Sequence, residues 1–215
     1  MAETFDPATV PIRIAATVML VRDAADGEPG VEVFMLRRTG NASFAAGMYV
    51  FPGGKVDAAD YPGDGDDYRA ALNAAIRETR EEAGLVITED QLVYFAHWTT
   101  PEGARRRFAT WFFLCILDDD QEVQVDGGEI ALHRWVRPDD AFAELADPEN
   151  PFRLMPPTYV SLVDIAEHCD CRTARENLHR RDALVFEPRM VFVDDGICFL
   201  YDGDAGYHDQ DLDVP

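Results

Sequence analysis

The sequence predicts an α/β fold, a sandwich of helices on a mixed β-sheet. Strand-like apolar runs occur on both sides of one amphipathic helix, and more helical segments follow it. The chain has 215 residues and 47% of them are hydrophobic, which suits one domain with a substantial core. We expect that domain to span residues 1–215, with a core over about 12–147 and an extension over about 148–215.

Two apolar segments near the start of the chain are typical of a β-hairpin. Residues 12–21 and 31–36 are rich in β-branched and apolar side chains, and a Gly/Pro-containing turn over 26–30 lies between them. Residues 48–54 read as a short strand that runs into a glycine pair. The Pro/Gly/Asp-rich residues 61–67 predict a loop.

The pattern becomes helical over residues 68–83. Small and apolar side chains recur there at spacings of three and four, which predicts an amphipathic helix. Asp67 is the expected N-cap, and Gly84 stands where a C-cap glycine belongs. The later part of the chain predicts strands over 91–98, 107–117 and 133–136, helices over 138–146, 157–168 and 173–181, and a hairpin with strands over 190–193 and 197–201. The acidic stretch 202–215 is expected to be partly loose.

The charge of the chain limits its partners. With 19 basic and 41 acidic residues, the formal net charge is −22, which disfavours a nucleic-acid polymer or an anionic membrane surface as partner. Something other than net charge would have to attract an anionic substrate, and a bound metal ion is the obvious candidate. Residues 1–6 do not resemble a signal peptide, and no apolar run is long enough to span a membrane, so we expect a cytoplasmic protein. The four cysteines show no C-x-x-C spacing, and we expect them to be reduced thiols.

Three glutamates gather on one flank of the predicted helix. Glu78, Glu81 and Glu82 are spaced at i,i+3 and i,i+4, and Glu82 borders the apolar stripe. Arg77 is i,i+4 to Glu81 and can offset part of their repulsion. A hard divalent cation such as Mg²⁺ can offset the rest, since it prefers oxygen ligands. The alternative is a solvated acidic helix face without a ligand.

The surrounding residues favour the metal site. The segment Phe51-Pro52-Gly53-Gly54-Lys55-Val56-Asp57 precedes the helix, and together with residues 77–85 it resembles the motif of the Nudix hydrolase family, G-x5-E-x7-R-E-U-x-E-E-x-G-U, where U is apolar. Gly54 matches the first glycine. This sequence has Asp60 where the family has glutamate, and the loop before Arg77 is nine residues longer. The resemblance therefore assigns no contact to Asp60, which is one methylene shorter than the family's glutamate.

The resemblance implies a Nudix-type α/β/α sandwich, with the C-terminal helices and hairpin added to it. It implies an enzyme that hydrolyses a diphosphate linked to another moiety, with Mg²⁺ as cofactor and Mn²⁺ as a substitute. Carried over by position, Glu78, Glu81 and Glu82 are metal ligands, and so is the Gly53 carbonyl. Glu78 is our first choice for the general base, Glu82 is the surest ligand, and Arg77 orients the carboxylates.

Family members often add an acidic ligand from a later loop. Glu129, just before the strand predicted at 133–136, is our candidate, and the alternative is a solvent-facing glutamate. His97 and His133 could act as bases instead. Each lies in an apolar strand, where a histidine more often belongs to the core.

Several segments extend the resemblance to a Nudix branch with an insertion in the motif, which includes the peroxisomal coenzyme A diphosphatases of animals. They are residues 44–60, 106–113 and 202–207. Arg105, Arg106 and Arg107 form a basic triplet that could bind the additional phosphate of coenzyme A, and Gly54 would let a phosphate approach the backbone. Coenzyme A or its acyl esters lead as substrates; ADP-ribose, dinucleotides and nucleoside triphosphates stay open, as do a non-catalytic nucleotide-binding module and a homodimer.

Overall fold

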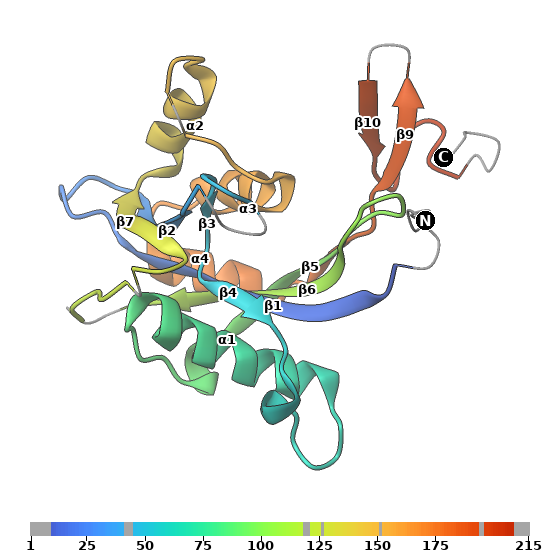
Figure 1. Cartoon of the computed structure of the whole chain (residues 1–215). Coiled ribbons are helices and arrows are strands. Elements are labelled where there is room, and N and C mark those ends of the chain that lie inside the picture. The colour runs from blue at the N-terminus through green and yellow to red at the C-terminus, as the bar shows by residue number, and fades with distance from the viewer. Residues whose placement is uncertain are drawn as a thin grey trace.

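A mixed β-sheet forms the middle layer of the structure (Figure 1). The computed structural model describes residues 10–40, 45–117, 121–125, 127–150, 152–193 and 196–208. In these residues the main sheet has eight strands: β1 (Ile12–Asp23), β2 (Val31–Arg38), β3 (Tyr49–Val50), β4 (Gly53–Lys55), β5 (Val93–Thr99), β6 (Arg107–Ile116), β7 (Ile130–Val136) and β8 (Leu184–Phe186).

The strands run in the order β3-β2-β1-β6-β5-β8, with β4 paired to β1 and β7 paired to β2. The pairs β1–β6 and β5–β8 are parallel and the others antiparallel, so the sheet is mixed as predicted. The expected hairpin is the β1–β2 pair, in which Val21 faces Val33. The long β1 strand lies at the centre because both its edges are paired: β6 along one, and β2 and β4 along the other.

Helix α1 (Asp67–Ala83) covers one face of the sheet. Its alanine-rich stripe packs on Val18, Leu20 and Phe113, so the helix lies close to the strands. The helix ends at Gly84, which adopts the left-handed conformation at φ 71° and donates its N–H to the Arg80 carbonyl. The predicted N-cap was wrong by one residue. Asp66 caps the helix by accepting the Arg69 N–H at 3.1 Å, while Asp67 is its first residue.

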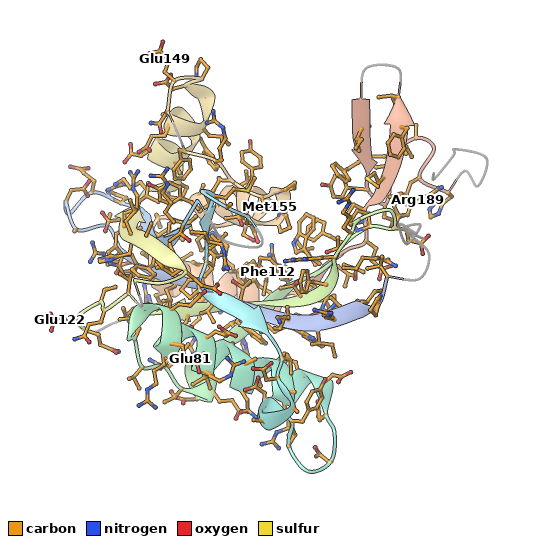
Figure 2. All side chains as sticks on the ribbon, viewed as in Figure 1. Glu81, Phe112, Glu122, Glu149, Met155 and Arg189 are labelled. Atoms are coloured by element: carbon orange, nitrogen blue, oxygen red, sulfur yellow. The ribbon has the colours of Figure 1, made fainter. Side chains whose placement is uncertain are left out.

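Three helices cover the opposite face and complete the sandwich. They are α2 (Pro138–Ala146), α3 (Pro156–Ala166) and α4 (Cys171–Arg180). Phe112 of β6 and Met155 at the start of α3 lie on this side of the sheet (Figure 2). Because side chains alternate along a strand, Met35 of β2 joins this core while its neighbours Phe34 and Leu36 join the core under α1.

The C-terminal part holds the predicted hairpin and one strand that the sequence did not predict. Strands β9 (Arg189–Val193) and β10 (Gly196–Leu200) pair in a separate two-stranded sheet that stands away from the sandwich (Figure 1). The unpredicted strand is β8, three residues long and paired to the edge of β5. Phe44 and residues 209–215 lie outside the described part of the chain. Among the described residues, no helix is long and apolar enough to cross a membrane.

Candidate active site

Helix α1 presents the three glutamates at different depths. The side chain of Glu82 is 10% exposed, and its Oε2 accepts the backbone N–H of Gly53 at 2.9 Å. The Glu78 side chain is 16% exposed, whereas Glu81 is 59% exposed on the helix surface (Figure 2). The helix therefore brings two largely buried carboxylates against the glycine turn and leaves the third at the rim.

The glycine pair lets the sheet approach the helix. Gly54 faces Ala16 across the β1–β4 pair. A Cβ atom at position 54 would overlap the Glu78 carboxylate, lying 2.8 Å from its Oε2 and closer still to Cδ and Oε1. A Cβ atom at Gly53 would lie 2.7 Å from the Cα of Thr17. Both positions require glycine because the space is already filled, at 53 by backbone and at 54 by a carboxylate.

Arg77 joins the helix to the turn. Its Nε and Nη2 atoms form a fork with Asp60, at 3.0 Å to Oδ1 and 2.8 Å to Oδ2. Its Nη1 atom donates to Glu78 at 2.8 Å and to Glu81 at 3.1 Å. Nη2 also donates to the Lys55 carbonyl at 3.1 Å. One guanidinium thus fixes two of the three glutamates and the chain that leads from the glycine pair.

Burial sets the acidities in this cluster. Burial raises the pKa of Glu82 to about 7, although the hydrogen bond from the Gly53 N–H opposes the shift. Burial also raises the pKa of Glu78, against the hydrogen bond from Arg77. Burial acts on Asp60 in the same sense, but the hydrogen bonds from Arg77 and from the Asp57 N–H outweigh it, so the pKa of Asp60 is lowered. Asp60 is therefore a stable anion, whereas Glu82 is a buried carboxylate with little compensating charge.

Glu129 lies next to this cluster, and an arginine that the sequence analysis missed connects the two. Arg38, the last residue of β2, pairs with Glu129 at 2.5 Å and with Glu82 at 3.7 Å. The Thr39 N–H also donates to the Glu129 carbonyl at 2.8 Å. Strand alternation from the buried Leu36 could have placed Arg38 on the α1 face. The contact of Arg38 with Glu129 depends on a register shift between β2 and β7 at Arg37/Arg38. The sequence gives no clear signal for that shift.

The arginine triplet lies farther along the sheet. Arg107 begins β6 and faces Ile12 of β1, while Gly54 faces Ala16 on the other side of the same strand. Four residues of strand separate the two positions, or about 13 Å along β1. Arg107 itself donates to the Thr100 carbonyl at 3.1 Å, and Arg105 and Arg106 are exposed. The structure therefore does not place the triplet in contact with the glutamates.

Neither histidine is fully buried in the core, where we expected both to lie. His97 is half-buried and its ring meets Trp111 edge-on at 4.8 Å, while burial lowers its pKa. His133 is exposed, which corrects the expectation, because its position in β7 alternates with the partly buried Leu132 and Arg134. Neither histidine has a contact with the glutamates among the described residues.

The donor set fits a hard divalent cation. Carboxylate oxygens are the ligands that Mg²⁺ prefers, and the cationic partner of buried Glu82, Arg38, lies 3.7 Å away. Within the described residues, no three acidic, histidine or cysteine side chains already converge in metal-binding geometry. The reason is visible in the contacts: Glu78 and Glu81 are drawn to Arg77, and Glu82 is drawn to the Gly53 N–H. To share one ion, these side chains would have to adopt other rotamers.

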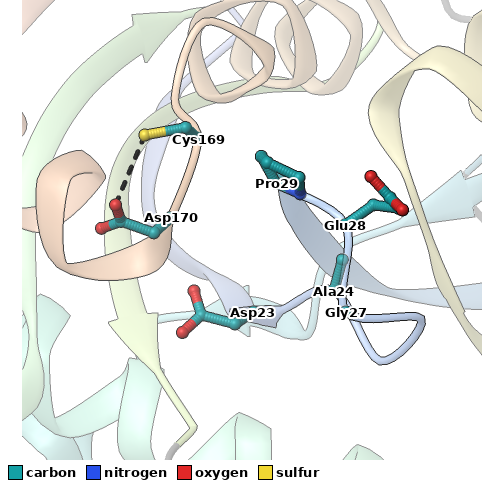
Figure 3. Close-up of a pocket in the computed structure, with 8 residues that line it drawn as sticks. Asp23, Ala24, Gly27, Glu28, Pro29, Cys169 and Asp170 are labelled. Carbon is teal, nitrogen blue, oxygen red and sulfur yellow. Dashed lines mark hydrogen bonds between the residues drawn. The ribbon is translucent and has the colours of Figure 1, made fainter.

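A pocket of about 420 Å³ lies elsewhere, between the β1–β2 turn and the α3–α4 connection (Figure 3). Cys171 donates its N–H to Asp23 at 2.7 Å there, and Cys169 contacts Asp170 at 3.4 Å. None of the lining residues belongs to the glutamate cluster. This pocket therefore plays no part in the candidate site.

Comparison with solved structures agrees with the fold. The crystal structure of a NUDIX hydrolase from Alicyclobacillus acidocaldarius superimposes with a TM-score of 0.67 at 24% identity, covering 78% of this chain and 97% of that one. The NUDIX domain of Shewanella oneidensis NrtR, solved with ADP ribose, gives a TM-score of 0.53 at 16% identity, covering 77% of this chain and 93% of that one. These likenesses concern the fold.

Sequence comparison gives the family. The chain is 25% identical to putative nudix hydrolase 7 of Caenorhabditis elegans over 217 aligned positions, 83% of this chain and 70% of that protein. It is 32% identical to the human acyl-coenzyme A diphosphatase NUDT19 over 121 positions, which cover 51% of this chain and only 30% of that protein. Residues 11–156 match the NUDIX domain. The chain therefore belongs to the NUDIX family of hydrolases.

Proposed function

We propose that this protein is a Mg²⁺-dependent pyrophosphohydrolase that cleaves a nucleoside diphosphate linked to another moiety. The observation that carries the proposal is the contact of two buried glutamates, Glu78 and Glu82, with the glycine turn at 53–54. A diphosphate bound there would meet carboxylates from the helix and backbone from the turn. Because the net charge is −22, a bound cation would help this acidic site to attract that anion.

Each residue of the cluster has a proposed role. Glu78, Glu81, Glu82 and Glu129 would hold Mg²⁺ together with the Gly53 carbonyl, and Mn²⁺ would substitute. The ion supplies charge neutralisation of the diphosphate and a more acidic water. Glu78 is the proposed general base because it lies beside Gly54 and burial raises its pKa. Arg77 orients Glu78 and Glu81 through Nη1 and is held in turn by Asp60.

Coenzyme A or an acyl-coenzyme A is the leading substrate. Two facts support it: the 32% identity to an acyl-coenzyme A diphosphatase over about half of this chain, and the basic triplet Arg105–Arg107, whose last member begins β6 of the main sheet. Coenzyme A carries a further phosphate beyond its diphosphate, and arginines could bind that group bidentately. ADP-ribose, dinucleotides and nucleoside triphosphates are the competing substrates, and a homodimer and a cytoplasmic location remain predictions.

A substrate panel tests the proposal. The pure protein is incubated with Mg²⁺ and coenzyme A, ADP-ribose, NADH, diadenosine polyphosphates or nucleoside triphosphates, and the products are identified by mass spectrometry. Release of 3′,5′-ADP and 4′-phosphopantetheine, abolished by EDTA, is expected. Glu82→Gln should be inactive, while Glu176→Gln on the exposed side of α4 should match the wild type. A protein that binds Mg²⁺ but cleaves nothing in the panel is a binding module instead.

A further inference from the structure

In the described part of the chain, the largely buried side chain of Arg38 has one hydrogen-bond donor without a partner. It ends β2 on the α1 face, where its side chain is only 13% exposed. Among the described residues, its Nε has no hydrogen-bond partner, although the atom is buried. A buried donor without a partner costs free energy, so such an atom is a place to look for a missing ligand.

The carboxylates around Arg38 hold it only in part. The bond to Glu129 is short, at 2.5 Å, but Glu129 is 65% exposed, and solvent weakens such a pair. The pair with Glu82 is long, at 3.7 Å, and Glu82 turns its other oxygen to the Gly53 N–H. The guanidinium can therefore exchange Glu129 for another anion at small cost.

The site needs an arginine of this kind. Arg77 is already engaged by Asp60, Glu78, Glu81 and the Lys55 carbonyl. The triplet at 105–107 begins about four strand residues from the register of Gly54. Arg38 instead lies 3.7 Å from Glu82, next to the proposed binding site of the diphosphate. An arginine can bind two phosphate oxygens at once.

We propose that Arg38 binds the diphosphate of the substrate and that Glu129 and Glu82 hold its guanidinium in readiness until the anion arrives. This inference rests on the proposed function, because it assumes a diphosphate at the glutamate cluster. It assigns Arg38 to the binding of the substrate anion rather than to the support of the metal ligands. The two roles predict opposite changes in metal affinity.

The experiment compares Arg38→Met, Arg38→Lys and Arg181→Met with the wild type. Arg181 is the matched control, since it also has a buried Nε without a partner among the described residues and is also paired with a carboxylate, that of Asp164. It lies at the end of α4 and belongs to neither the glutamate cluster nor the glycine turn. Affinity for Mn²⁺ alone is measured by titration calorimetry. Affinity for ADP is measured in the presence of Ca²⁺, and KM and kcat are measured on the substrate that the panel identifies.

Arg38→Met should bind ADP about 10- to 100-fold more weakly and raise KM by a similar factor, the loss expected for a charge-assisted hydrogen bond. It should bind Mn²⁺ as tightly as the wild type or more tightly, because a positive charge has left the cluster. Arg38→Lys should recover part of the ADP affinity, and Arg181→Met should change neither affinity. If Arg38→Met does not fold, Arg38→Gln takes its place.

Two results would overturn the inference: unchanged ADP affinity, or Mn²⁺ affinity that falls in step with ADP affinity. The second result would assign Arg38 to holding the carboxylates. Failure of the proposed function is a separate outcome, namely wild-type protein that cleaves nothing in the panel while its ADP affinity still depends on Arg38. Wild-type protein that binds neither Mn²⁺ nor ADP would overturn both proposals.

Discussion

Arg77 and Asp60 form a two-pronged ion pair that joins the acidic helix to the chain leaving the glycine turn. The two bonds measure 3.0 and 2.8 Å, and the Asp60 side chain is only 5% exposed. Asp60 is one methylene shorter than the glutamate of the family motif, yet it reaches Arg77 because the short 3-10 turn at Ala58–Asp60 brings it close to the helix. A shorter acid thus makes the connection in this chain.

Asp60→Asn should destabilise the protein by about 1.5–3 kcal/mol, because the partly buried Arg77 guanidinium loses the charge of its main partner. Urea denaturation at pH 7 measures the change. Since the pKa of Asp60 is lowered in the folded protein, its contribution is present above the unfolded value of about 3.8 and is lost as pH falls. Asp64→Asn, in the exposed loop, is the control and should have little effect. Equal stability of the two variants would contradict this account of Arg77.

Glu82→Gln should stabilise the metal-free protein at pH 8 and have little effect near pH 4.5. Folding raises the pKa of Glu82 from 4.5 to about 7, so between these values the unfolded chain has released a proton that the folded protein still holds. The free energy of unfolding therefore falls as pH rises through this window, by up to about 3 kcal/mol from this group. Thermal melts in EDTA at pH 4.5 and 8 measure the difference. If Glu82→Gln raised the melting temperature equally at both pH values, the charge of Glu82 would not be the cause of the stabilisation.

Mg²⁺ should raise the melting temperature of the wild type and not that of Glu82→Gln. A ligand that binds only the folded state stabilises it by about 2.7 kcal/mol at 100 times its dissociation constant. Glu82 is the proposed central ligand, so the variant should lose most of this gain. Glu176→Gln should retain it, since Glu176 pairs with Arg180 on the exposed face of α4. An equal rise in all three proteins would indicate that Mg²⁺ binds somewhere else.

The sequence predicts the parts of this fold that have a strong local signal. Helix α1 has an apolar stripe and a C-cap at Gly84, and the motif around it indicates Glu78, Glu82 and Arg77. These side chains meet the glycine turn because a single helix of fixed period carries them all. Their roles in catalysis and metal binding remain predictions.

The features that the sequence did not predict depend on contacts between distant segments. Strand β8 is three residues long and exists by pairing with β5, from which it is separated by about 90 residues of chain. Arg38 meets Glu129 through a register shift between β2 and β7. His133 is exposed because of its place in β7, although its neighbours in sequence are partly apolar. No periodicity within one segment encodes such pairings.

Gly53→Ala should lower stability by about 1–3 kcal/mol, the usual cost of overpacking. The added methyl group would lie 2.7 Å from the Cα of Thr17 and would also press on the Ala16 carbonyl, and backbone in a central strand cannot move aside easily. Urea denaturation measures the loss. The matched control is Gly63→Ala, where a methyl group meets nothing within 4 Å. A loss no greater than that of the control would mean that β4 can move away from β1.

Gly54→Ala should leave the fold nearly intact and abolish most of the activity. Here the methyl group would meet the end of the Glu78 side chain, which can rotate away, so the cost in stability is smaller than at Gly53. The rotated carboxylate would leave the position proposed for the general base, and loss of a general base costs about 10²- to 10⁴-fold in kcat. Steady-state kinetics beside circular dichroism separates activity from folding, with Gly63→Ala again as the control. A well-folded Gly54→Ala enzyme with normal kcat would remove Glu78 from that role, because the Glu78 carboxylate cannot keep its place once position 54 carries a side chain.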